Sequence, residues 1–172
     1  DSSLNYVREE GETLKLSKKD IVAEGEFENG DRAQFVDLGN ETELRYLCVE
    51  ALSSWGGDTH TAIAELHLVD AEGTWLDRDP WKVIYADSEE IRAESASAAN
   101  VTDNQPVTFW HTQYKGKAKG SNGKHPHQIV IDLGKVMKVK QLRYLPRNGP
   151  NPGKVKAFRV YGSVERFEGL NP

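Results

Sequence analysis

Short runs of strand-forming residues, each closed by a turn, recur along the whole of this 172-residue chain. They are rich in β-branched and aromatic residues, and several alternate apolar with polar side chains. The runs are residues 34–38, 45–50, 62–69, 81–85, 128–132, 139–145 and 157–161. Clusters of Gly, Asn, Asp and Pro, such as residues 28–31 and 148–153, separate them. Many short strands with frequent turns predict an all-β sandwich.

Helical and surface signals are few. The best helical candidates are the short segments 17–22 and 87–92. The paired carboxylates Glu9-Glu10 and Glu89-Glu90 are predicted to lie on the solvated surface.

Length and composition fit one soluble globular domain with its own core, at 37% hydrophobic and 28% charged residues. The net charge is −5, and the one basic cluster lies in a glycine-rich loop, so nucleic-acid binding is not expected. That cluster consists of Lys115, Lys117, Lys119 and Lys124. No apolar run approaches the roughly 20 residues that cross a bilayer.

Cys48 is the only cysteine, so no intrachain disulfide can form, and we expect this residue to be buried in its strand.

Three segments resemble a known family in their order and spacing. Residues 99–112 combine a tight polar loop with a strand ending in Thr-Phe-Trp-His, and residues 127–134 form a strand closed by Asp-Leu-Gly. Leu145-Pro-Arg147 follows them. Together they resemble the coagulation factor 5/8 type C (discoidin) family, of which the family 32 carbohydrate-binding modules are a branch. This resemblance implies a jelly-roll-like antiparallel β-sandwich that binds ligands in its loops and performs no chemistry.

The resemblance extends over most of the chain, but in a changed order. Residues 80–163 resemble the family's N-terminal two thirds, and residues 1–75 resemble its C-terminal third. One explanation is a circular permutation within a single domain of residues 1–172; the other is the tail of one module followed by the head of the next. Because two half-sandwiches would expose open core faces, one complete set of elements favours permutation.

The polar loop also predicts a metal site. Carbonyl, carboxylate and hydroxyl oxygens within eight residues suit Ca²⁺ rather than Zn²⁺. In the family a structural Ca²⁺ lies at this loop and is completed by a strand glutamate. The implied ligands are Val101, Asp103, Gln105, Thr108, and Ala64 or Glu65. Asn104 stands where Gly is usual, and Gln105 where Asp is common, so an Asx turn without metal is the alternative.

A spatial expectation follows from this ligand set. Asp103 and Thr108 should form half of a corner whose other half, Ala64 and Glu65, comes from earlier in the chain.

The loops also offer candidates for ligand binding. Sugars bind to aromatic faces and to planar polar side chains that pair with hydroxyl groups. The candidate residues are Trp55, His60, His111, Tyr114, Arg147 and Asn148. We expect Trp110 in the core, while Trp55, flanked by Gly and Ser, favours an exposed role. For Arg147, a structural ion pair is an equal alternative.

No arrangement typical of catalysis is present. The chain has no nucleophile elbow, and His125-Pro-His127 lacks the spacing of zinc peptidases, so we do not expect an enzyme.

The leading prediction is a non-catalytic carbohydrate-binding module that targets a polysaccharide-active enzyme to glycan. The resemblance implies a place in a larger, extracellular or cell-surface protein. The alternatives are a protein- or lipid-interaction module without glycan binding, or a spacer without a ligand. Membrane insertion is not expected, because the loop at 114–127 is basic and carries one aromatic residue.

Overall fold

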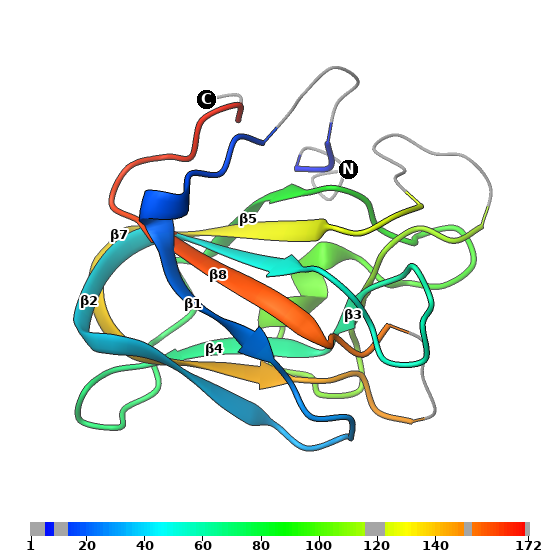
Figure 1. Ribbon diagram of the computed structural model, residues 1–172, viewed down its shortest axis with the longest axis horizontal. Helices are drawn as coiled ribbons and strands as arrows, with labels where there is room; N and C mark the ends of the chain where they lie inside the picture. The colour runs from blue at the N-terminus through cyan, green and yellow to red at the C-terminus, as the bar shows by residue number, and fades with distance from the viewer. Residues whose placement is uncertain (1–5, 9–13, 116–122, 150–152, 171–172) are drawn as a thin grey trace.

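Antiparallel strands form two layers that two long strands, β2 and β7, join at one end of the molecule (Figure 1). The computed structural model describes residues 6–8, 14–115, 123–149 and 153–170. The strands are β1 (Ile21–Glu26), β2 (Gln34–Ala51), β3 (Ala62–Ile63), β4 (Glu65–Val69), β5 (Lys82–Ala86), β6 (Trp110–His111), β7 (His127–Leu145) and β8 (Ala157–Ser163). Short 3-10 turns cover Lys18–Asp20 (η2) and Ala98–Thr102 (η3). The predicted all-β sandwich is therefore confirmed.

β2 and β7 pair with each other along most of their length and contribute to both layers. The main sheet has the order β1-β8-β2-β7-β4, and β5 also pairs with β7. β5 and β8 flank the end of β2 and the start of β7, while β4 pairs with the last residues of β7. Figure 1 shows the β2–β7 ribbon curving from the upper layer into the lower one. Strands from both sides of residue 80 thus lie in one sheet.

The Asp-Leu-Gly triplet occurs twice, once where each long strand changes register. Asp37 Oδ1 accepts the Gly39 N–H at 2.9 Å, and Asp132 Oδ1 accepts the Gly134 N–H at 2.8 Å. Both glycines have a positive φ, +96° and +86°. Since L side chains disfavour this conformation, glycine allows each strand to bend there.

Two hydrophobic clusters form the core. The larger lies between the layers and contains Trp110, which is fully buried as predicted. The smaller covers the outer face of the upper layer and includes Tyr46, Tyr85 and Tyr161, with terminal residues packed over it. Cys48 belongs to this second cluster and is fully buried, as predicted, and burial raises the pKa of its thiol.

Several sequence predictions are wrong. Segment 17–22 holds one 3-10 turn that leads directly into β1, and segment 87–92 contains no helix. Glu89 and Glu90 are buried rather than solvated, because their carboxylates accept main-chain N–H groups. Glu9, Glu10, Lys117 and Lys119 lie outside the described residues. Among the residues that the structure describes, no helix has the length and apolar character needed to cross a bilayer.

Candidate functional site

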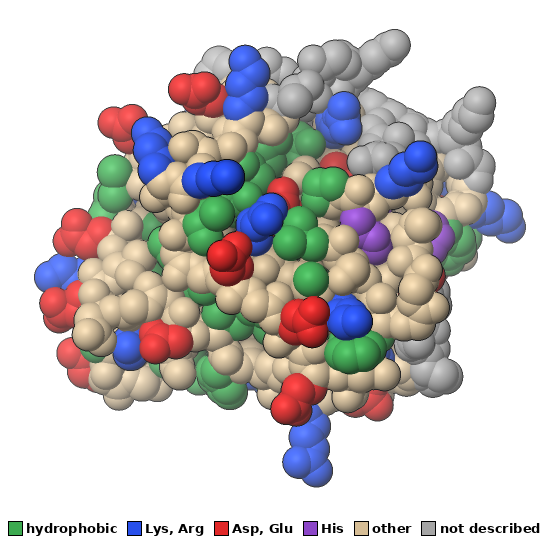
Figure 2. All heavy atoms as spheres, viewed as in Figure 1, with side chains coloured by type: hydrophobic (Ala, Val, Ile, Leu, Met, Phe, Trp, Pro, Cys, Tyr) green, Lys and Arg blue, Asp and Glu red, His purple; other side chains and the backbone are tan. Residues whose placement is uncertain are grey.

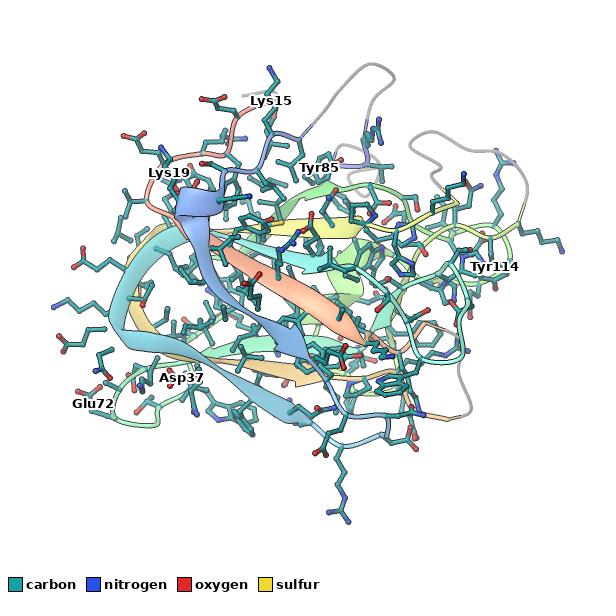
Figure 3. All side chains as sticks on the ribbon, viewed as in Figure 1. Lys15, Lys19, Asp37, Glu72, Tyr85 and Tyr114 are labelled. Carbon is teal, nitrogen blue, oxygen red and sulfur yellow. The ribbon has the colours of Figure 1, made fainter. Side chains whose placement is uncertain are left out.

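Four of the six predicted ligand residues line one pocket of about 350 Å³ at the loop end of the sandwich. They are His60, His111, Tyr114 and Arg147, and Glu94 completes the wall. Tyr114 lies at the end opposite the β2–β7 bend in Figure 3, and the histidine side chains visible in Figure 2 gather toward that same end. The structure therefore brings together four of the residues predicted to bind ligand. Glu94 was not predicted, because nothing in the sequence distinguishes it from a surface carboxylate.

The aromatic rings of the pocket pack edge to face. The His111 and Tyr114 ring centroids are 4.8 Å apart, and those of His60 and Tyr114 are 6.0 Å apart. Tyr114 donates its hydroxyl hydrogen to Glu94 Oε1 at 2.9 Å and remains 46% exposed. The Arg147 guanidinium lies 4.3 Å from the centre of the Phe109 ring. This stacking orients the five N–H donors of Arg147.

His111 provides a hydrogen-bond acceptor at the base of the pocket. Its Nδ1 lies 2.6 Å from the Thr112 carbonyl oxygen, and a carbonyl can only accept, so Nδ1 carries the hydrogen. Burial lowers the pKa of the ring, which keeps it neutral. Its Nε2 is then an acceptor, complementary to a ligand hydroxyl.

Glu90 organises the two loops that carry Glu94 and Tyr114. One carboxylate oxygen accepts the N–H groups of Arg92 and Ala93, and the other accepts those of Tyr114 and Lys115. Although burial opposes ionisation, these four N–H donors lower the pKa of Glu90. A single buried carboxylate thus fixes both sides of the pocket.

A buried ion pair holds the loop that carries His60. His127 Nδ1 lies 2.7 Å from Asp87 Oδ2, and its Nε2 lies 2.7 Å from the Thr59 carbonyl oxygen. Both partners are acceptors, so a protonated ring satisfies them together. Burial alone would lower the pKa of His127, but the bond to Asp87 outweighs burial and raises it.

The structure does not bring the other two predicted ligand residues into this pocket. Trp55 is half-buried, donates its indole N–H to the Phe27 carbonyl oxygen at 3.2 Å and lies beneath Lys156. These contacts give Trp55 a packing role rather than the exposed role predicted for it. Asn148 is exposed beside Arg147 but does not line the pocket.

The segments predicted to form a metal corner do meet. The Gln105 N–H lies 3.0 Å from Glu65 Oε1 and 2.9 Å from Asp103 Oδ1. Thr108 donates its hydroxyl hydrogen toward Asp103 Oδ2, and its Oγ1 lies 3.0 Å from the Gln105 carbonyl oxygen. Asn104 adopts the left-handed φ of 61° that glycine usually supplies. Ala64 precedes Glu65 and donates its N–H to Leu145.

Arg78 enters this corner, which the sequence did not predict. Its Nη1 lies 2.6 Å from Glu65 Oε2 and 3.2 Å from the carbonyl oxygen of Val101, an implied metal ligand. The same nitrogen lies 3.1 Å from the Leu66 carbonyl oxygen. One resident positive charge therefore pairs with Glu65 in this corner.

The donor set fits a hard cation. Burial and the neighbouring Asp103 together raise the pKa of Glu65 to about 7, although Arg78 opposes them. The Thr108 hydroxyl has one hydrogen but two nearby acceptors, the Asp103 carboxylate and the Gln105 carbonyl oxygen. The corner therefore contains more acceptor oxygens than hydrogens to satisfy them. Within the described ranges, no three His, Cys, Asp or Glu side chains are placed to hold a metal. A cation here would depend on carbonyl and hydroxyl oxygens, as Ca²⁺ does.

Comparison with known proteins supports the family resemblance. Residues 84–168 match the model of the F5/8 type C domain. Over 90 residues, the chain is 34% identical to a sialidase of Micromonospora viridifaciens. That match covers 52% of this chain and 13% of the sialidase, so the chain spans only a small part of that relative. Taken with the antiparallel sandwich, these matches show that residues 84–168 resemble the F5/8 type C (discoidin) family.

Proposed function

We propose that this chain is a non-catalytic carbohydrate-binding module of a larger, extracellular or cell-surface protein. The observation that carries the proposal is the pocket in which Tyr114, His111, Arg147 and Glu94 converge. Binding sites for small polar ligands combine an aromatic wall with a few oriented polar groups. This pocket has both, on loops that buried acidic side chains hold in place.

The polar groups complement the hydroxyl groups of a sugar. Arg147 offers parallel N–H donors, and the His111 Nε2 and the Glu94 carboxylate offer acceptors. The exposed part of the Tyr114 ring can pack against the C–H face of a pyranose. Donor, acceptor and apolar surface thus lie within one 350 Å³ space.

The module would act by targeting. A weak sugar affinity raises the local concentration of an attached catalytic domain near its polymer. The matched region makes up only 13% of a protein named sialidase. This supports a module that is one part of a larger, multidomain enzyme.

We further propose a structural Ca²⁺ at the corner of Glu65 and Asp103. The carboxylates of both residues, the Thr108 hydroxyl and the carbonyl groups of Val101, Gln105 and Ala64 would hold it. The ion would neutralise the close carboxylates and fix the loop that leads into β6. Calcium-dependent thermal stability, compared with stability in EDTA, tests this part of the proposal.

Affinity electrophoresis tests sugar binding. The protein would be run through gels containing galactan, arabinogalactan, xylan, mannan, β-glucan or mucin, with calcium in the buffer. We expect retardation in at least one gel and its loss in Arg147→Ala. Asn148→Ala is the matched control, because this neighbour lies outside the pocket wall and should leave the retardation unchanged. Absence of retardation in every gel would contradict the proposal and favour a protein-interaction module.

A further inference from the structure

A second exposed aromatic residue, Trp75, lies outside the wall of the Tyr114 pocket. It follows a tight turn in which Asp70 Oδ1 accepts the N–H groups of Glu72 and Thr74. Trp75 pairs with Val69 as an isolated bridge, yet its side chain is 50% exposed. Figure 3 places Glu72, from the same turn, at the opposite end of the molecule from Tyr114.

Two side chains of the sheet pack against the Trp75 indole. The His67 ring centroid lies 4.5 Å from that of Trp75, and the Arg143 guanidinium lies 4.8 Å from the Trp75 ring centre. His67 and Arg143 are directly paired on β4 and β7, so both project from the same face of the sheet. The indole therefore packs against both residues and is still half exposed. A large apolar ring held in this way is preorganised for stacking.

Beside this ring lies a separate pocket of about 300 Å³. Its wall comprises His67, Trp75, Leu76, Asp77, Arg78, Asp79, Thr102 and Asn104. Two carboxylates, a hydroxyl and an amide therefore surround an aromatic surface. This is the combination that recognises polyhydroxylated rings.

The charged residues of the Trp75 pocket favour a neutral ligand over an acidic one. Arg78 is already paired with Glu65 at 2.6 Å, and Arg143 lies beneath the indole. The carboxylates of Asp77 and Asp79 would repel a phosphate or an acidic sugar. A neutral saccharide avoids this repulsion and can donate its hydroxyl hydrogens to both carboxylates.

We propose that Trp75 is the platform of a second glycan-binding site, which takes a neutral pyranose ring. The sugar stacks on the outer indole face while Asp77, Asp79 and Asn104 bind its hydroxyl groups. With two separate sites on the sandwich, one module can hold two parts of a polysaccharide or two chains, which strengthens its binding to polymers. The site is separate from the Tyr114 pocket and shares with the proposed function only the class of ligand.

The indole N–H signals in a two-dimensional ¹⁵N NMR spectrum test this inference. Trp55, Trp75, Trp81 and Trp110 give four such signals, and each is assigned from its Trp→Phe variant. The ligands are neutral galacto-, gluco-, manno- and xylo-oligosaccharides. We expect the Trp75 signal to shift saturably with at least one series, in wild type and in Arg147→Ala. Trp110 is fully buried and should not respond, so it serves as the internal reference.

Variants separate this site from the Tyr114 pocket. Trp75→Ala should weaken binding to any retarding polysaccharide about tenfold or more through lost avidity. Phe35→Ala removes another exposed aromatic side chain, from outside the Trp75 pocket, and should change nothing. If Trp75 does not respond to any series, this inference is overturned, whether or not the Tyr114 pocket binds sugar. If Trp75 responds while Arg147→Ala binds polysaccharide like wild type, the second site is supported and the proposed pocket fails.

Discussion

Buried carboxylates at single positions organise the loops of this protein. Asp87 and Glu90 lie in one irregular segment, and each accepts main-chain N–H groups that no helix or strand satisfies. The sequence did not indicate their burial, because paired acidic residues are exposed in most proteins. Their role follows only from the loops that converge on them.

Glu90→Gln should destabilise both the fold and the pocket. The substituted amide keeps one acceptor oxygen but turns an NH₂ group toward two main-chain donors, at a cost of about 2 kcal/mol. Urea unfolding should show this loss, and the variant should also bind polysaccharide less tightly. Glu94→Gln is the matched control, because it changes a carboxylate on the pocket wall and should leave the unfolding free energy within about 0.5 kcal/mol of wild type. Equal unfolding midpoints for wild type and Glu90→Gln would contradict the role assigned to Glu90.

His125 should make stability depend on pH. Burial and the neighbouring His127 lower its pKa to about 4, below the ordinary value of 6.5. Between these two values the unfolded chain takes up a proton that the folded chain does not, so the folded state loses stability as the pH falls. The unfolding free energy of wild type, relative to that of His125→Gln, should therefore decrease from pH 6.5 to pH 4. A difference that stays constant over this range would disprove the lowered pKa.

At the scale of elements, the two bends convert a flat ribbon into a sandwich. The sequence predicted segments 34–38 and 45–50 as separate strands, whereas the structure joins them in β2, and the same holds for the two predicted segments within β7. Strand patterns are interrupted at Gly39 and Gly134 because the chain bends there without leaving the sheet. The repeated Asp-Leu-Gly was visible in the sequence, but its role depends on the pairing of β2 with β7.

Gly134→Ala should destabilise the fold by about 2 kcal/mol. The new methyl group would lie 3.2 Å from the Pro80 carbonyl oxygen, and the φ of +86° disfavours any L side chain. Thermal unfolding measures the effect. Gly123→Ala is the control, because nothing lies within 4 Å of its added Cβ. A Gly134→Ala variant as stable as wild type would rule out this account of the bend.

Arg78→Gln should make the stability of the corner of Glu65 and Asp103 more dependent on calcium. Removing the guanidinium leaves the nearly buried Glu65 carboxylate without its partner, which costs about 3 kcal/mol. A bound Ca²⁺ would offset part of that cost. We therefore expect a larger fall in melting temperature in EDTA than in calcium. Equal falls in both buffers would contradict a shared electrostatic role for Arg78 and the ion.

At the scale of the whole molecule, local strand patterns and the resemblance of motifs were enough to predict the fold class, some buried residues and one contact between distant segments. The all-β class, the burial of Trp110 and Cys48 and the meeting of Glu65 with the Asp103 loop agree with the structure. The packing of Trp55 and the contacts of Arg78 could not be predicted, because their neighbours Phe27, Lys156 and Val101 come from distant parts of the chain. Strands on both sides of residue 80 share one sheet, and the circular permutation itself stays a prediction.

The position of a bound saccharide is the decisive test of the proposed sugar site at Tyr114. A crystal structure of the protein with an oligosaccharide from the polysaccharide that retards it would give that position. We expect a sugar ring against Tyr114, with hydroxyl groups bonded to Arg147 and His111. A crystal in which the sugar leaves this pocket empty and binds elsewhere would contradict it.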